Sequence, residues 1–146
     1  MKLKQLSVFL ENKPGALSAP CRLLAKAGIN IQTFALADTR EFGILRLVVE
    51  DPDRARRLLI RNGFAVKLTE VVALEVPDVP GGLAAILDAL DGSGINVEYA
   101  YAFTTKHQGH GLLVFRFDDP DSAIKILKSH KISAVDSEEL SKRLKG

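Results

Sequence analysis

Cysteine is nearly absent from this sequence, which has Cys21 and no other among its 146 residues. One cysteine excludes a disulfide or a cysteine-based metal site within a single chain. Because Cys21 lies in an amphipathic stretch beside Leu23 and Leu24, we interpret it as a small core residue.

Long apolar runs and a surplus of one charge are also missing. No run approaches the ~18 residues of a membrane span, and the N-terminus lacks the features of a signal peptide. We therefore expect a cytoplasmic protein with no membrane partner. The 20 basic and 18 acidic residues are interspersed, and the net charge is +2, so nothing indicates nucleic acid binding. With 47% apolar and 26% charged residues, the chain is typical of a folded protein.

What the sequence does contain is a stretch that occurs twice. Pro14-Gly15-x-Leu17 and Gly28-Ile29-Asn30 recur 66 positions later, beginning at Pro80 and at Gly94. Asp51-Pro52-Asp53 recurs 68 positions later. The difference between the two offsets indicates that the second copy has two inserted residues between these blocks. We place the insertion in the hairpin turn, which is 39–43 in the first copy and 105–111 in the second, because hairpin turns tolerate added length.

In each copy the spacing of the apolar residues predicts the same order of elements: a strand, a helix, a hairpin of two strands, a second helix and a last strand. The first copy predicts strands at 3–10, 29–37, 44–49 and 64–68, with helices at 16–27 and 52–60. The second predicts strands at 71–76, 97–104, 112–117 and 132–135, helices at 83–90 and 122–129, and a short polar helix at 137–145. This is β-α-β-β-α-β twice, which predicts the α+β class with two ferredoxin-like domains, 1–69 and 70–146. Pro20 conflicts with the first helix, which either begins late with Ser18 capping it or is kinked.

Together these motifs resemble the ACT domain. The resemblance rests on Glu11-Asn12-Lys13-Pro14-Gly15 with Gly28-Ile29-Asn30, and on Asp78-Val79-Pro80-Gly81 with Gly94-Ile95-Asn96. It covers residues 3–136 and is similar to the tandem, free-standing subgroup. It implies a non-catalytic module that binds a small effector, usually an amino acid. It also implies two antiparallel four-stranded sheets paired side by side into an eight-stranded sheet, with helices on one face.

The same resemblance implies effector sites at the loop after the first strand of each copy. Gly15 allows a tight turn, and the amides of Ala16 and Leu17 would open the helix as free donors for a carboxylate. An Asn side chain offers both a donor and an acceptor to a zwitterion. We favour the first-copy loop, with a wall of aromatic residues that suits an apolar or aromatic ligand. The candidate ligand-binding residues are Asn12, Gly15, Ala16, Leu17, Asn30, Asp78, Gly81, Gly82, Leu83, Asn96, Tyr99 and Tyr101.

Structural explanations of the same residues stay open. The glycines would serve the turn even without a ligand, Asn30 and Asn96 could hold the helix-to-strand turn, and Asp78 could be a helix N-cap. Tyr99 and Tyr101 share a strand face with Phe103 and could pack at a domain or subunit interface.

Other function classes find less support in the sequence. No nucleophile motif, phosphate loop or dinucleotide fingerprint is present, so we expect neither an enzyme nor a cofactor. His107 and His110 have no nearby carboxylate and make a poor metal site. Residues 110–117 lack the aromatic side chains of an RNA-binding strand at Leu112 and Val114. We expect an amino acid effector and a homodimer. The alternative is a regulatory subunit that docks on an amino-acid-metabolism enzyme, a biosynthetic enzyme for example, without an effector of its own.

Overall fold

The computed structural model describes residues 1–38 and 40–145, and all of their side chains except those of Asp38, Thr105 and His107. The chain forms two compact units. The first unit is Lys4–Thr69, and the second comprises Glu70 onward together with Met1–Leu3. Lys2 also contacts the second unit through its side chain, because its ammonium forms ion pairs with Glu70 at 2.7 Å and Asp121 at 3.0 Å. Hydrogen bonds to the same two carboxylates raise the pKa of Lys2. Met1–Leu3 thus lies with the second unit, and the division into domains 1–69 and 70–146 stays a prediction.

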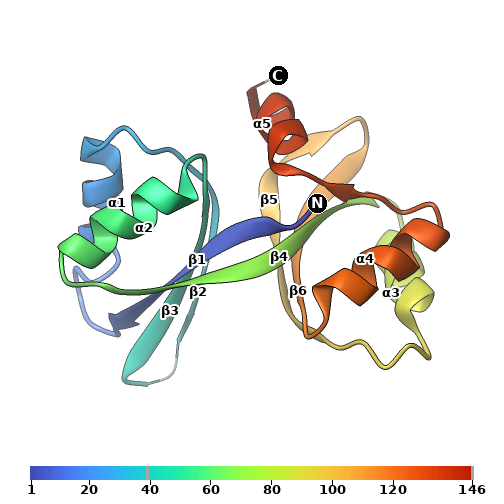
Figure 1. The fold of residues 1–146 in the computed structure, drawn as a ribbon, viewed down its shortest axis with the longest axis horizontal. Coiled ribbons are helices and arrows are strands. Elements are labelled where there is room, and N and C mark those ends of the chain that lie inside the picture. Colours follow the sequence, from blue (N-terminus) through green and yellow to red (C-terminus); the bar gives the residue numbers. More distant parts are fainter. Residues whose placement is uncertain (39, 146) are drawn as a thin grey trace. The chain divides into compact units, whose positions relative to one another are not determined.

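The first unit carries two helices on one face of its strands (Figure 1). Its strand order is β2-β3-β1-β4, and the pairs β1–β3 and β2–β3 are antiparallel. This is the order of a split βαβ fold. The elements are β1 (Leu3–Glu11), α1 (Ser18–Lys26), β2 (Ile31–Asp38), β3 (Phe42–Val49), α2 (Pro52–Arg61) and the first part of β4 (Ala65–Pro77).

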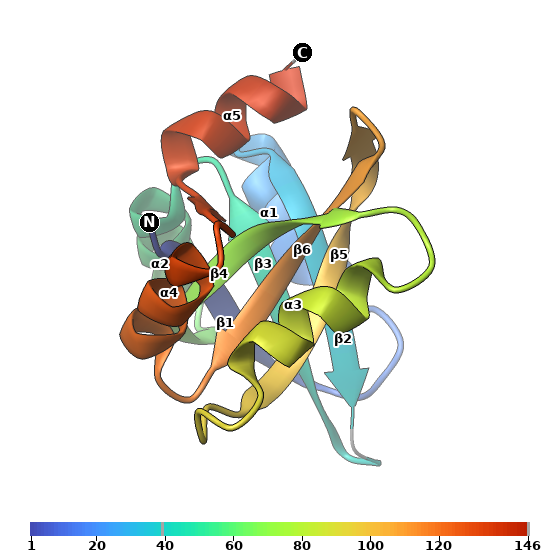
Figure 2. The ribbon, with the colours of Figure 1, turned by 90° about the vertical axis from the view of Figure 1, so that its right-hand side faces the viewer.

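The second unit repeats this arrangement, with α3 and α4 on one face of its strands (Figure 2). The strand order is β5-β6-β4-β7, with antiparallel pairs throughout. One further helix, α5, follows the last strand. The elements are the remainder of β4, α3 (Gly82–Leu90), β5 (Val97–His107), β6 (His110–Phe117), α4 (Pro120–Ser129), β7 (Ala134–Val135) and α5 (Ser137–Lys145).

The α+β class and the ferredoxin-like repeat are therefore confirmed. The described residues form seven strands rather than the eight predicted, because the strands predicted at 64–68 and 71–76 are one continuous 13-residue strand, β4. The residues between them, Thr69 and Glu70, include no glycine or proline that would end a strand. The hairpin β5–β6 is also longer than predicted, since it closes tightly at Gln108 and Gly109, both with positive φ. Thr39, in the other predicted turn, lies outside the described residues.

Helix α1 begins late, at Ser18, which settles the conflict over Pro20. Leu17 occupies the N-cap position without a side-chain hydrogen bond, so the prediction that Ser18 caps the helix was wrong. The Ser18 hydroxyl instead donates to the Gly15 carbonyl at 3.3 Å. Pro20 falls in the first turn, where a missing N–H leaves no helical hydrogen bond unmade.

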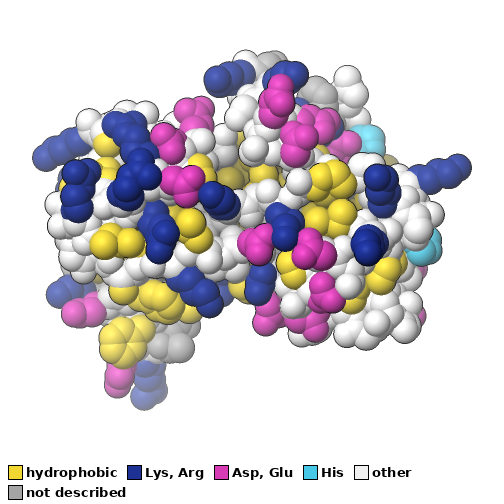
Figure 3. Space-filling view, viewed as in Figure 1, with side chains coloured by type: hydrophobic (Ala, Val, Ile, Leu, Met, Phe, Trp, Pro, Cys, Tyr) yellow, Lys and Arg dark blue, Asp and Glu magenta, His cyan; other side chains and the backbone are white. Residues whose placement is uncertain are grey.

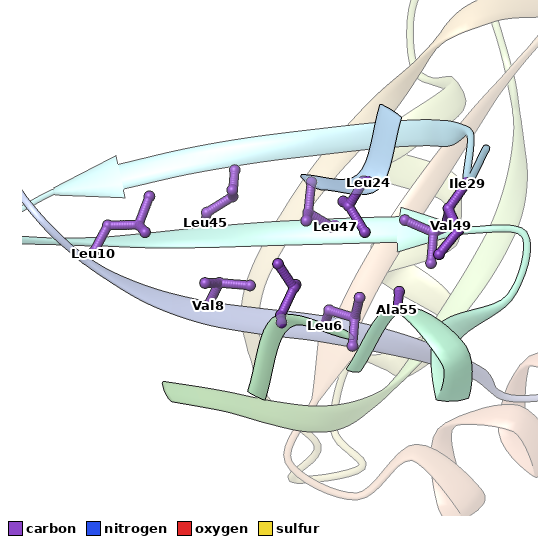
Figure 4. Packing of buried hydrophobic residues seen from close by; sticks show 10 residues of the cluster. Leu6, Val8, Leu10, Leu24, Ile29, Leu45, Leu47, Val49 and Ala55 are labelled. Carbon is purple, nitrogen blue, oxygen red and sulfur yellow. The ribbon is translucent and has the colours of Figure 1, made fainter. Parts of the chain in front are cut away.

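The core of the first unit lies between its strands and its helices (Figure 4). Alternate residues of β1 and β3 point toward Leu24 of α1 and Leu59 of α2, and both leucines are completely buried. Each buried side chain of this size stabilises the fold by roughly 1.5–3 kcal/mol. The strand residues of this cluster are Leu6, Val8, Leu10, Leu45, Leu47 and Val49.

The second unit has a matching core of aliphatic and aromatic side chains. Phe115 and Phe117 of β6 stack with their ring centroids 5.6 Å apart. They pack with Leu74 of β4 and Leu127 of α4. Across the described residues of both units, the helices are too short and too polar to cross a bilayer.

Candidate functional site

The loop after β1 is a tight turn built around Gly15. This residue has a φ of +83°, a left-handed conformation that favours glycine. The Lys13 amide donates to the Glu11 carbonyl at 3.0 Å, and the Ala16 amide donates to the Lys13 carbonyl at 3.2 Å. The expectation that Ala16 and Leu17 offer free helix-opening amides was wrong for Ala16, because its amide serves the turn and the helix opens at Ser18.

Asn12 connects this loop to the turn between β2 and β3. Its amide nitrogen donates to the Glu41 carbonyl at 2.9 Å, and its side-chain Nδ2 donates to the Arg40 carbonyl at 3.3 Å. The Asn12 side chain therefore holds the loop in place through the neighbouring turn.

A cavity of about 510 Å³, which we call the first pocket, opens beside this loop. Of the five first-copy candidates, Gly15 and Ala16 line it and Asn12, Leu17 and Asn30 do not. Its lining includes an ion pair, because the Lys13 ammonium lies 3.1 Å from the Glu11 carboxylate. The lining residues are Phe9, Leu10, Glu11, Lys13, Pro14, Gly15, Ala16, Ala19, Gly63, Phe64 and Ala65.

The segment Gly63–Ala65 of this pocket was missed by sequence reasoning. It lies almost fifty residues after the loop, and no motif joins the two. The expected strand order could nevertheless have indicated that this segment lies beside the loop. In the order β2-β3-β1-β4 the strands β1 and β4 are neighbours. In a split βαβ fold these two strands run antiparallel, which places the end of one beside the beginning of the other.

Asn30 lies at the opposite end of α1, which has nine residues and is about 13 Å long. It lines a separate hollow with Cys21, Gly28 and Ile29. Partial burial raises the pKa of the Cys21 thiol, which disfavours the reactive thiolate.

The corresponding loop of the second unit is held by different groups. Asp78 stands where the first unit has Asn12, and its amide donates to the Gly109 carbonyl at 2.9 Å. Its carboxylate forms an ion pair with Lys106. Gly81 is the N-cap of α3 with a φ of +85°. A Cβ at Gly82 would lie 2.0 Å from the Pro77 carbonyl oxygen, so the backbone requires glycine there. Leu83 is 44% exposed.

The remaining candidates lie away from that loop. The Asn96 amide donates to Asp118 Oδ1 at 2.9 Å, and the Asp118 amide donates to the Asn96 carbonyl at 3.2 Å. Tyr99 and Tyr101 alternate with Ala100, which pairs with the core residue Phe115. Both tyrosines are therefore on the sheet face opposite to α3 and α4.

A second cavity, of about 400 Å³, lies at the end of β4 in the second unit, and we call it the second pocket. Among the predicted site residues it includes Gly82 alone. Its lining residues are Glu75, Pro77, Gly82, Ala85, Ile86, His110, Lys131, Ile132, Ser133, Ala134, Val135, Glu139 and Arg143.

A comparison with protein families identifies the fold. The family model described as "ACT domain pair" matches residues 1–144. The chain belongs to this family. The resemblance to a tandem ACT protein is thus confirmed.

Solved structures extend the comparison. The crystal structure of protein BT0572 from Bacteroides thetaiotaomicron is 41% identical over 96% of each chain, with a TM-score of 0.89. The regulatory subunits of aspartate kinase from Thermus thermophilus and Thermus flavus are each 16% identical. They match 86% of this chain and 91% and 90% of their own, with TM-scores of 0.60 and 0.58. This lower identity shows the shared fold alone. A search of curated proteins gave no match.

Membership in the ACT pair family supports a regulatory role, since its members are typically non-catalytic regulatory proteins. Within the part of the chain that the structure describes, no group of three or more His, Cys, Asp and Glu residues is arranged to hold a metal. The His107 side chain, one of the two weak metal candidates, lies outside the described residues.

Proposed function

We propose that this ACT pair is a cytoplasmic, non-catalytic regulatory protein that binds an amino acid with an apolar or aromatic side chain in the first pocket. The observation that carries the proposal is a pocket lining that combines apolar side chains with one carboxylate and one ammonium. A free amino acid with an apolar side chain matches this lining, because it combines a zwitterionic head group with an apolar part.

The orientation of the ligand follows from these charges. The Lys13 ammonium attracts the α-carboxylate, and the Glu11 carboxylate accepts hydrogen bonds from the α-ammonium. Both groups are more than half exposed, with 63% and 65% of their side-chain surface accessible. They can therefore turn toward a ligand at small cost. The ligand's side chain then packs between Phe9 and Phe64.

Gly15 and Ala16 serve this site by being small. Gly15 has no heavy atom within 4 Å of the position that a Cβ would take. The backbone of the loop is therefore open to a ligand. Asn12 supports the site indirectly, through its hydrogen bonds to the β2–β3 turn. In this proposal the other candidates have structural roles in their own turns and strands and do not contact the ligand. They are Asn30, Asp78, Gly81, Leu83, Asn96, Tyr99 and Tyr101.

The chain also forms a homodimer in this proposal, through the edge strand β2. Phe34 and Leu36 of this strand are 56% and 47% exposed, and an apolar edge strand readily pairs with another chain. Figure 3 shows apolar side chains gathered over the region of β2 and β3. A larger enzyme of amino acid metabolism is the alternative occupant of this edge, and aspartate kinase regulatory subunits share the fold.

Calorimetric titration of the full chain with each of the twenty amino acids tests the proposed ligand class. We expect one or a few apolar or aromatic amino acids to bind. Lys13→Met and Glu11→Gln should each weaken that binding by about tenfold, the effect of losing one charge-assisted hydrogen bond.

Lys67→Met is the matched control, because Lys67 is exposed on β4 and does not line the pocket. Equal affinity in all four proteins would refute the assignment of the site. If no amino acid binds and the chain is isolated in a stoichiometric complex with a larger enzyme, the docking alternative is correct.

A further inference from the structure

The two helices of the first unit carry a strong excess of positive charge. Helices α1 and α2 contain six cations and one carboxylate, that of Asp53, which is a net charge of +5. The whole chain has a net charge of only +2. Folding thus brings together cations that are interspersed with acidic residues in the sequence, and Figure 3 shows Lys and Arg side chains gathered over these helices. The six cations, all exposed, are Arg22, Lys26, Arg54, Arg56, Arg57 and Arg61, and we call this surface the basic face.

The cations of each helix follow its long axis. Arg54, Arg57 and Arg61 are spaced i, i+3 and i+7, so they form one stripe on α2. The two cations of α1 are spaced i and i+4 and form a second stripe. Nη2 of Arg54 donates to the carbonyl of Ala27, at the end of α1, at 2.8 Å. The basic face therefore extends across both helices.

Neighbouring acidic groups do not balance these charges. Among the residues whose side chains the structure describes, none of the six cations forms an ion pair. The Asp53 carboxylate lies 3.3 Å from the ammonium of Lys4 on β1, and so it pairs with a cation outside the basic face. Like charges three or four residues apart destabilise a helix. The stripe on α2 consequently costs the first unit some stability.

The second copy shows that the fold does not require this charge. Helices α3 and α4 contain two cations and two carboxylates, and so they have no net charge. Both pairs of helices nevertheless cover the same kind of apolar core. A role of the surface, rather than folding, therefore accounts for the excess. The replaced positions are Arg22 with Asp88 at the offset of 66, and Arg54 with Ser122, Arg56 with Ile124 and Arg61 with Ser129 at the offset of 68.

The composition of the basic face indicates the chemistry of its partner. The centre of a protein–protein interface is apolar and poor in charge, whereas a protein–DNA interface is polar and strongly positive. Of the large apolar side chains on α1 and α2, both of which the structure describes completely, Ile60 alone is exposed. Arginine also binds a phosphate group through two parallel hydrogen bonds, which lysine cannot do. These properties favour a polymer of phosphates.

Two other phosphate-bearing partners fit less well. A single strand binds through bases that stack on aromatic side chains, and neither α1 nor α2 contains an aromatic residue. A helix that lies on an anionic membrane inserts its apolar side between the lipids. The apolar side of α2, with Ala55 and Leu59, is buried in the core instead.

We propose that the basic face binds the phosphate backbone of double-stranded DNA, independently of base sequence. DNA is preferred to an RNA duplex because an α-helix fits the major groove of B-form DNA, about 12 Å wide, and not the narrow groove of A-form RNA. In that groove the arginines of α2 contact phosphates, and the cations of α1 contact the adjoining backbone. This role goes beyond effector binding and does not depend on the ligand of the first pocket.

Fluorescence anisotropy of a short labelled DNA duplex, titrated with the full chain at several salt concentrations, tests the proposal. We expect a dissociation constant of about 1–100 μM near physiological salt, the range of sequence-independent binding. The logarithm of the association constant should fall with the logarithm of salt concentration with a slope of about −5, as six phosphate contacts require. Arg57→Gln with Arg61→Gln should weaken binding at least tenfold and make the slope shallower by about 2.

The matched control is Lys125→Gln with Lys128→Gln. It removes the same charge from exposed positions of α4, and Lys125 is the counterpart of Arg57 at the offset of 68. This variant should bind the duplex as wild type does. Arg57→Lys with Arg61→Lys keeps the charge and should keep the salt slope. Circular dichroism checks that each variant is folded, which we expect because every substituted side chain is exposed.

Several results would overturn the proposal. One is the absence of duplex binding at low salt, and another is an equal loss in the arginine and lysine variants, which would mean that only total charge matters. Tighter binding to a single strand, to an RNA duplex or to vesicles of anionic phospholipid would assign the basic face to that partner instead.

Discussion

Single residues of the two loops are constrained in different ways. Gly15 needs its backbone angle but has free space where a side chain would be, whereas Gly82 has no room for one. The sequence repeat indicated glycines at 15 and 81, but the steric need at Gly82 depends on the path of Pro77 in the folded chain.

Alanine at each glycine should separate these two constraints. We expect Gly15→Ala to lower the free energy of unfolding by about 1 kcal/mol, the cost of a left-handed alanine. Gly82→Ala should lower it by about 3 kcal/mol, because a Cβ 2.0 Å from the Pro77 oxygen forces the backbone to move. Urea denaturation measures both. A Gly82→Ala protein as stable as wild type would show that the loop moves freely.

The N-cap of α4 makes stability depend on pH. The Ser122 hydroxyl and amide donate to the Asp119 carboxylate at 2.7 Å and 3.1 Å, and these bonds lower the pKa of Asp119. The pKa of Asp119 is therefore lower in the folded protein than in the unfolded chain. The cap stabilises the fold fully at pH values above the unfolded-state pKa of about 3.9. It is lost as the pH falls through the folded-state pKa.

Two measurements check this cap. The stability advantage of wild type over Asp119→Asn should be constant near neutral pH and should disappear in acid. In Ser122→Ala, an NMR titration should find the pKa of Asp119 closer to its ordinary value. An Asp119 pKa that does not respond to Ser122→Ala would contradict the assigned cause.

At the scale of helices and strands, amphipathic patterning predicted most elements. Helix α2 is an example, because its capping sequence Asp51-Pro52 and its buried Leu59 were both visible as a pattern. The merging of two predicted strands into β4 was not, since a polar residue such as Glu70 interrupts the apolar pattern without breaking the strand. Helix α5 was predicted, but its contribution to a pocket was not, because α5 has no counterpart in the first copy.

Two neighbouring residues of α2 test its orientation. Leu59 is fully buried and Ile60 is 48% exposed. Leu59→Ala should cost about 2–5 kcal/mol of unfolding free energy, whereas Ile60→Ala should cost less than about 1 kcal/mol. Thermal and urea unfolding compare the pair directly. Similar losses in both variants would mean that α2 packs through a different face.

The edge strand β2 tests the proposed homodimer. A lysine at the edge prevents strand pairing between chains, so Phe34→Lys should sediment as a monomer where wild type sediments as a dimer. Ile60→Lys is the control, because Ile60 is about equally exposed but lies on α2. If Phe34→Lys remains dimeric while Ile60→Lys dissociates, the interface lies on the helices.

For the whole molecule, the internal repeat explains why each unit has a cavity beside the corresponding loop. The repeat and the ACT resemblance could be read from the sequence because glycine, proline and asparagine recur at fixed spacing. The positions of Glu11, Lys13 and Phe64 around one cavity could not, since their convergence depends on strand order. Asn30 was placed in the site by resemblance, and the length of α1 separates it from the loop of its own unit.

The most direct test of the effector site is an amide NMR titration of the full chain with the apolar amino acid that binds best. We expect the signals of Gly15, Ala16 and Phe64 to shift together with one dissociation constant, while those of Gly28 and Asn30 stay in place. Shifts centred on Asn30, or no saturable shift with any amino acid, would contradict it.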